Sequence, residues 1–67
     1  MEIWEQLKCR RISLGMSVSR VAKLTYLSRK TIYNVENGLG SKATEHHLDL
    51  FYNEFEDKLN GFHNKWL

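Results

Sequence analysis

The chain of 67 residues contains no proline, so glycine is the main residue at which regular structure can end. Its glycines are Gly15, Gly38, Gly40 and Gly61. Between them, apolar residues recur at intervals of three and four positions, as on one face of an α-helix. No strand-like alternation, internal repeat or low-complexity tract is present. The sequence therefore predicts an all-α fold, a compact domain of four helices, or five.

A chain of this length forms one domain at most, and its small core leaves little stability to spare. We expect the domain to span residues 1–60, with residues 61–67 as an aromatic C-terminal tail. Charge is uneven: residues 1–38 carry seven basic and three acidic side chains, whereas residues 39–67 carry three and five. A basic front half suits a polyanion-binding face, although ordinary surface variation is the alternative.

Composition excludes several classes of protein. Cys9 is the only cysteine, so neither an internal disulfide nor a multi-cysteine metal site can form. His46 and His47 are adjacent, and neighbours on a helix point about 100° apart and do not converge on one ion. No catalytic Ser/His/Asp set or glycine-rich phosphate loop is present. With no apolar run of membrane length and no signal-peptide pattern, we expect a cytoplasmic protein, not an enzyme, without metal or cofactor.

The first segment has an apolar helical face formed by Ile3, Trp4, Leu7 and Leu14. Arg11 falls on this same face, where a guanidinium group is costly unless a carboxylate satisfies it. Glu36 lies near the inner edge of a later helix. The sequence therefore predicts an ion pair between these two side chains.

Two short helices follow, each with a serine N-cap. Ser17 caps a helix of about residues 17–25, and Ser28 caps one of about residues 28–36. The first helix has an apolar stripe of Val18, Val21, Leu24 and Thr25. The inner face of the second helix has Ile32 and Val35. Its outer face has Lys30, Tyr33, Asn34 and Asn37, with Arg29 and Thr31 on the flanks. Two helices joined by a short turn are typical of a helix-turn-helix unit. Basic residues in the first turn of the second helix suit guanine, and Asn34 suits adenine. A solvated helix face is the alternative.

Two segments resemble those of the phage repressor and Cro-type (XRE-like) helix-turn-helix family. Residues 7–17 (LKCRRISLGMS) look like its first helix and turn, and residues 28–38 (SRKTIYNVENG) look like its recognition helix with the Glu-Asn-Gly ending. The similarity covers about residues 3–58. It implies a lambda-repressor-like fold that binds double-stranded DNA, and a structural salt bridge between Arg11 and Glu36.

The resemblance also implies which residues contact DNA. Base contacts are expected from Arg29, Lys30 and Asn34; Tyr33 either contacts a phosphate or thymine methyl, or is a surface aromatic. Phosphate contacts are expected from Ser17, Ser28, Thr31, the Asn37 backbone and Lys42. The chain departs from the family at Val18, where glutamine is usual, and at Tyr26, where glycine is frequent. A left-handed backbone at Tyr26 would cost on the order of 1 kcal/mol.

The fourth segment, with Thr44 as its candidate cap, carries a long aromatic stripe. Its apolar positions are Leu48, Phe51, Tyr52, Phe55, Leu59, Phe62 and Trp66. Part of the stripe should cover the first three helices, and the rest needs a partner. The expected dimer interface is formed by Phe55, Leu59, Phe62, Trp66 and Leu67, unless the residues after Gly61 fold back onto their own domain.

Taken together, these patterns predict a homodimeric, sequence-specific DNA-binding regulator, a repressor that binds a (pseudo)palindromic operator. The alternative is a protein-binding module, antitoxin-like or anti-repressor, whose aromatic C-terminal helix contacts another regulatory protein.

Overall fold

The computed structural model describes the backbone of residues 1–65 and the side chains of residues 1–59. It contains four helices: α1 (Ile3–Ser13), α2 (Val18–Thr25), α3 (Arg29–Glu36) and α4 (Lys42–Lys65). No strand occurs in the described part. The predicted all-α, four-helix architecture is therefore confirmed, and the two short helices lie within one residue of their expected bounds.

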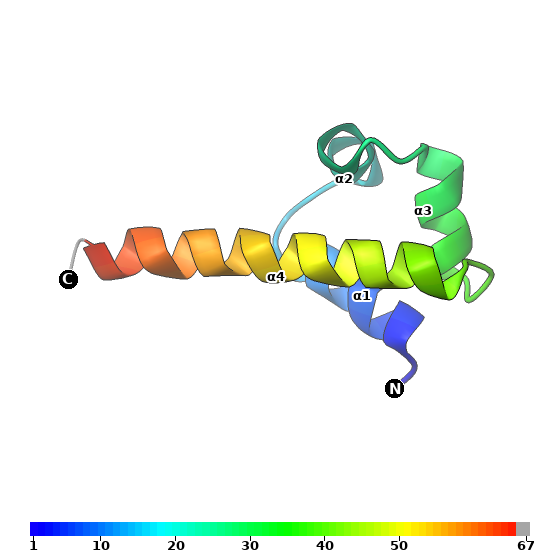
Figure 1. Cartoon of the computed structure of the whole chain (residues 1–67), viewed down its shortest axis with the longest axis horizontal. Helices are drawn as coiled ribbons and strands as arrows, with labels where there is room; N and C mark the ends of the chain where they lie inside the picture. The colour runs from blue at the N-terminus through cyan, green and yellow to red at the C-terminus, as the bar shows by residue number, and fades with distance from the viewer. Residues whose placement is uncertain (66–67) are drawn as a thin grey trace.

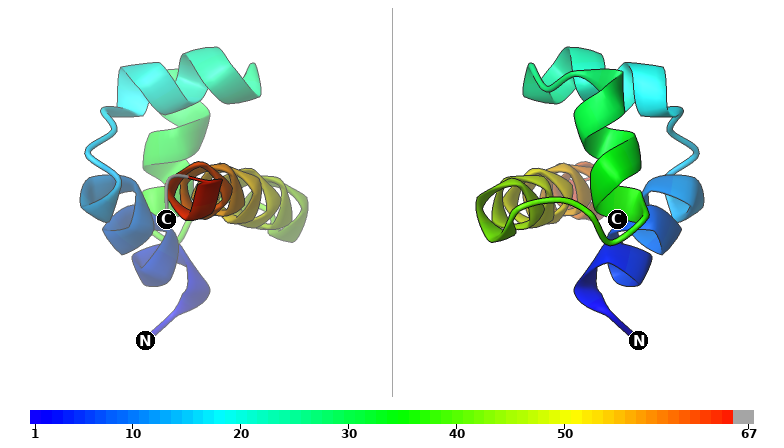
Figure 2. Two further views of the ribbon diagram at one scale, coloured as in Figure 1. Left: turned by 90° about the vertical axis from the view of Figure 1, so that its left-hand side faces the viewer. Right: turned by 90° about the vertical axis from the view of Figure 1, so that its right-hand side faces the viewer.

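The long helix α4 organises the arrangement of the other three. Helices α1, α2 and α3 gather around its N-terminal half, and its C-terminal half projects beyond them (Figure 1). Seen along its axis, α4 has the other three helices on one side (Figure 2). The molecule is accordingly elongated, with principal extents of 41 × 26 × 19 Å.

Every helix contributes to one core. Its buried apolar residues are Leu7, Met16, Val18, Val21, Ile32, Val35, Leu48 and Tyr52. The expected inner face of α3 is thus confirmed. Two expectations are wrong: Leu24 is 44% exposed and Ile3 is 41% exposed. Ile3 lies in the first turn of α1, at the edge of the core, whereas Leu24 faces an open groove beside α4.

Glycine ends α1 and α3 in the same way. At the end of α3, Gly38 adopts φ +79°, and the N–H groups of Gly38 and Leu39 donate to the carbonyls of Val35 and Asn34. This is a Schellman motif, which satisfies carbonyls left free at a helix end. A Cβ atom on Gly38 would also lie 3.2 Å from the Trp4 ring. The left-handed backbone angle favours glycine here, and the missing side chain lets the Trp4 ring of α1 pack closely.

The start of α4 differs from the prediction. Ser41, not Thr44, caps the helix: Ser41 Oγ accepts a hydrogen bond from the Thr44 N–H at 3.1 Å. Thr44 lies inside the first turn, and its hydroxyl pairs with that of Ser41. At its other end α4 continues through Gly61 to Lys65. One glycine costs only about 1 kcal/mol in a helix, and the flanking turns maintain the helix across it.

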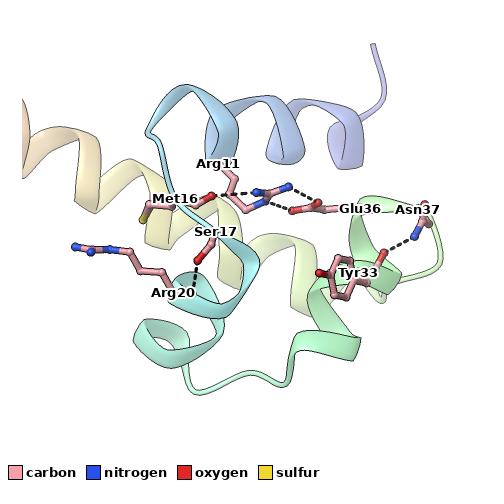
Figure 3. A network of polar contacts seen from close by, with 7 residues as sticks. All are labelled: Arg11, Met16, Ser17, Arg20, Tyr33, Glu36 and Asn37. Atoms are coloured by element: carbon pink, nitrogen blue, oxygen red, sulfur yellow. Dashed lines mark hydrogen bonds and ion pairs between the residues drawn. The ribbon is translucent and has the colours of Figure 1, made fainter.

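Arg11 and Glu36 join α1 to α3, as predicted. Arg11 Nε donates to Glu36 Oε2 at 2.7 Å, and Nη2 donates to Oε1 at 3.0 Å. The Arg11 Nη1 group donates to the Met16 carbonyl at 3.0 Å, so the guanidinium also fixes the α1–α2 connection (Figure 3). The two side chains are only 13% and 6% exposed. The hydrogen bonds to Glu36 raise the pKa of Arg11, so the guanidinium remains charged.

Arg10 joins α1 to α4 through a cluster that the sequence analysis missed. Its guanidinium donates to Asp49 at 2.7 Å, to Glu56 at 3.0 Å and to Asn53 at 2.6 Å. It also lies 5.5 Å from the centre of the Tyr52 ring. The available signal was the spacing of these three α4 residues, which places them on one helix face. Two consecutive arginines on α1 therefore hold two different helices.

Removing the carboxylate of the buried pair should destabilise the fold. We expect Glu36→Gln to lower the free energy of unfolding by about 3–5 kcal/mol, because Arg11 would keep its buried charge without a counter-charge. Glu56→Gln is the matched control; its partly exposed pair should contribute only about 0.5 kcal/mol. Urea denaturation measures both, and a Glu36→Gln loss no larger than the control would contradict the structural role of the pair.

Alkaline pH should destabilise the protein through Tyr52. Burial, with a smaller contribution from the charge of Glu36, raises the pKa of Tyr52 to about 12. Because the folded-state pKa lies above the usual value near 10, the stabilisation of the neutral phenol is complete below pH 10 and is lost as the pH rises towards 12. Denaturation at several pH values should show a smaller alkaline loss in Tyr52→Phe than in the wild type. Equal losses would contradict this assignment.

Candidate nucleic-acid interface

Helix α3 presents a polar outer face. Ile32 and Val35 are fully buried against the core, which turns the opposite side of the helix outward. On that side Arg29, Lys30 and Tyr33 are exposed, and Asn34 is partly exposed. The structure therefore brings together, on one helix, all four residues for which base contacts were predicted.

The turn between α2 and α3 consists of Tyr26, Leu27 and Ser28. The Thr25 hydroxyl closes the end of α2: it donates to the Val21 carbonyl at 2.7 Å and accepts from the Leu27 N–H at 3.4 Å. Tyr26 adopts the left-handed conformation, with φ 62° and ψ 19°. This is the conformation that the sequence analysis identified as costly for a tyrosine, on the order of 1 kcal/mol.

Serine hydroxyls cap the N-termini of three helices. Ser17 Oγ accepts from the Arg20 N–H at 3.1 Å (Figure 3), and Ser28 Oγ accepts from the Thr31 N–H at the same distance. The Ser28 and Thr31 hydroxyls also pair at 2.8 Å. One hydroxyl hydrogen is used within this pair, so the other can donate outward. The predicted phosphate ligands Ser17, Ser28 and Thr31 thus lie at helix N-termini, where anions are favoured.

Asn37 closes the end of α3 instead of offering a free N–H group. Its backbone N–H donates to the carbonyls of Tyr33 and Asn34. Its side-chain amide donates to the Tyr33 carbonyl at 2.8 Å (Figure 3). In this structure the Asn37 N–H satisfies carbonyls of the last helical turn, and its contact with a phosphate stays a prediction.

Positive charge is uncompensated over α2, α3 and the start of α4. Between Ile12 and Thr44 the only acidic residue is Glu36, which is buried and paired with Arg11. The same stretch has five exposed basic side chains, none of them in an ion pair among the described residues: Arg20, Lys23, Arg29, Lys30 and Lys42. Arg20 and Lys23 were not among the predicted site residues, although the lack of exposed acids around them was visible in the sequence.

Acidic residues gather instead along α4. They are Glu45, Asp49, Glu54, Glu56 and Asp57. Two of these, Asp49 and Glu56, are paired with Arg10. The molecule therefore separates a positive side, formed by the two short helices, from a more negative long helix. Such a separation orients a polyanion towards α2 and α3.

The described part of the chain was also searched for a metal site and a membrane-spanning helix. There, no group of three or more His, Cys, Asp or Glu side chains could hold a metal ion. Among the same residues, no helix has both the length and the apolar character needed to cross a membrane. His46 and His47 are exposed in the first turns of α4.

The structure describes the side chains of two of the five predicted dimer residues, Phe55 and Leu59. Phe55 is partly buried and packs beside Phe51, with ring centres 6.1 Å apart. Leu59, one turn further along α4, is 49% exposed. Phe62, Trp66 and Leu67 lie outside the side chains that the structure describes.

Comparison with known proteins identifies no relative. No protein-family model, curated protein or solved structure matches the chain. The functional interpretation therefore depends on the geometry and charge described above.

If the unpaired basic side chains contact phosphates, binding to duplex DNA should weaken steeply with salt. Phosphate contacts by Arg20, Lys23 and Lys42 would give a slope of log K against log salt of about −3 for each protomer bound. Lys42→Ala should make this slope shallower by about 1. Lys8→Ala is the matched control, because Lys8 is exposed on α1, which packs on the inner side of α3. Fluorescence anisotropy measures the slopes; a slope near zero for the wild type would exclude these contacts.

Proposed function

We propose that this protein is a sequence-specific, DNA-binding transcriptional regulator that inserts α3 into the major groove as part of a homodimer. The observation that carries the proposal is the exposed, unpaired positive charge over α2, α3 and the start of α4. Phosphate neutralisation supplies most of the affinity of such proteins for DNA. A merely solvated helix face would be expected to carry both signs of charge.

The outer face of α3 has the side chains needed to read bases. Arg29 and Lys30, in the first helical turn, suit the acceptors of guanine, and Asn34 suits the donor–acceptor pair of adenine. Tyr33 is 53% exposed beside them and can contact a thymine methyl group or a phosphate. Ser17, Ser28, Thr31 and Lys42 would then hold the flanking phosphates, with Arg20 and Lys23 added from the structure.

Dimerisation through α4 is supported by the course of that helix. Because α4 is continuous to Lys65, it carries the backbone beyond Gly61 away from the other three helices. This favours pairing with a second copy over folding back at Gly61. The proposed contacts are those predicted from the sequence, from Phe55 and Leu59 to Phe62, Trp66 and Leu67. Two copies would present two α3 helices to half-sites about 34 Å apart, as in a (pseudo)palindromic operator.

The regulatory role that we propose is repression in the cytoplasm, by a protein of the phage repressor and Cro type. The resemblance of residues 7–17 and 28–38 supports this, together with the exposed Cys9 thiol, which suits a reducing compartment. Selection of bound duplexes from a random pool tests the proposal. Enrichment of a palindromic site supports it, whereas recovery of unrelated sequences would contradict sequence-specific binding.

A second candidate function is a protein-binding module of antitoxin or anti-repressor type. The observation that favours it is the exposure of large apolar side chains, Leu24, Leu50 and Leu59, because such surfaces mark interfaces. Light scattering on the pure protein separates the two candidates. A stable homodimer supports the regulator, and a monomer that becomes soluble only with a partner supports the module.

Truncating the base-reading residues should reduce specificity. We expect Arg29→Ala and Asn34→Ala each to cost about 1–3 kcal/mol on the selected site and much less on unrelated DNA. Arg20→Ala is the comparison variant, since a phosphate contact should weaken binding to both DNAs equally. Equal losses on both DNAs for Arg29→Ala and Asn34→Ala would contradict base reading by α3.

A further inference from the structure

An open groove lies between the end of α2 and the outer side of α4. Its volume is about 310 Å³, and it is lined by Leu24, Thr25, Tyr26, His47, Leu50, Phe51 and Glu54. Its walls include large apolar surfaces that water reaches: Leu24 is 44%, Leu50 47% and Tyr26 96% exposed. Leu24, Leu50 and Tyr26 lie outside the core, so this part of the groove is a surface that another molecule can cover.

The α4 wall of the groove continues as a pattern of charge. Glu54 lines the groove, and Lys58, one helical turn further along, is exposed as well. Residues four apart lie on the same side of a helix. This side of α4 therefore presents an apolar patch at Leu50 and Phe51, then an acid, then a base, and the helix runs on unbroken to Lys65.

We propose that the groove is occupied by α4 of a second copy of this chain, packed antiparallel about a two-fold axis that crosses α4 near residue 56. In this register Glu54 of each copy faces Lys58 of the other, which gives two equivalent ion pairs. The inference rests on the homodimer proposed above and changes its surface. The contact lies on the side of α4 that carries Leu50, Glu54 and Lys58, whereas Leu59, about 120° around the helix from the midpoint of Glu54 and Lys58, lies outside it. An isologous interface must be complementary to itself, and an acid and a base placed symmetrically about one point satisfy this requirement.

The same register places the apolar positions against one another. Residues whose numbers add to 112 face each other, so Leu50 lies opposite position 62, a phenylalanine, and Phe51 lies opposite position 61, a glycine. A residue without a side chain lets two helices approach closely. The register thus gives a reason for a glycine at a position where α4 continues without a break.

The strained turn between α2 and α3 belongs to the other wall of the groove. Tyr26 has a left-handed backbone, φ 62°, yet its side chain is almost fully exposed and makes no core contact. Strain at such a residue persists when another interaction offsets it. Contact between the Tyr26 ring and the second copy supplies that interaction. It also connects dimerisation directly to the turn that positions α3.

The experiment is a charge exchange between two single variants. Glu54→Lys places bases at both positions, and Lys58→Glu places acids at both, so each homodimer would face like charges. We expect each variant alone to dimerise about ten-fold more weakly than the wild type in sedimentation equilibrium. An equimolar mixture should form heterodimers with an affinity within about three-fold of the wild type, because every pair across the two-fold axis is then opposite in sign.

Asp57→Lys is the matched control. It makes the same change of net charge at an exposed position about 80° around the helix from the midpoint of Glu54 and Lys58, and it should leave dimerisation unchanged. Three results would overturn the proposal. The mixture could dimerise as weakly as the two variants do alone, or the wild type could be monomeric. Asp57→Lys could also weaken dimerisation as much as Glu54→Lys does. These experiments are carried out without DNA. A wrong dimer register is therefore distinguished from a failure of the protein to bind DNA.

Tyr26→Gly gives an independent readout. Removing the left-handed strain should raise the melting temperature of the isolated protomer, measured at a concentration below dimerisation. The same change should weaken dimerisation several-fold, because the aromatic wall of the groove is lost. A variant that is both more stable and equally dimeric would show that Tyr26 does not contact the second copy.

Discussion

The ion pair between Arg11 and Glu36 is the interaction on which the rest of the structure depends. Its bidentate geometry fixes α3 against α1, and the third donor of the same guanidinium holds the connection that leads into α2. The pair is nearly inaccessible to water, so its Coulomb attraction is screened far less than that of a surface pair. The orientation of α3, and hence of its outer face, follows from this contact.

The same pair also shapes the electrostatic surface. Because Glu36 is neutralised by Arg11 and buried, no exposed carboxylate remains between Ile12 and Thr44. The acids that follow this stretch of the chain lie along α4, where Arg10 pairs with two of them, Asp49 and Glu56. Two adjacent arginines therefore assemble the fold and also separate its charges, leaving a positive side over the two short helices.

Sequence patterns predicted the local features well. Helical periodicity, the serine caps and the terminal glycines identified α2 and α3 nearly to the residue, because each of these signals acts over a few neighbouring positions. The Arg11–Glu36 pair was also predictable, since a charged residue on an apolar face demands a partner. The errors concerned the exposure of Leu24 and the residue that caps α4, which is Ser41 and not Thr44. Sequence patterns leave the candidates for a core position or a cap equal, and packing and hydrogen-bond geometry decide between them.

By itself, the sequence determined which segments are helical and which side of each is apolar, and it placed the candidate DNA-reading residues on one helix. Only the tertiary structure decided how distant segments meet. It showed that Arg10 holds α4, that the Asn37 N–H is used within α3, and that Tyr26 forms the wall of a groove with residues of α4. The physical reason is that these features depend on distances between helices, and such distances are set by the packing of the whole core.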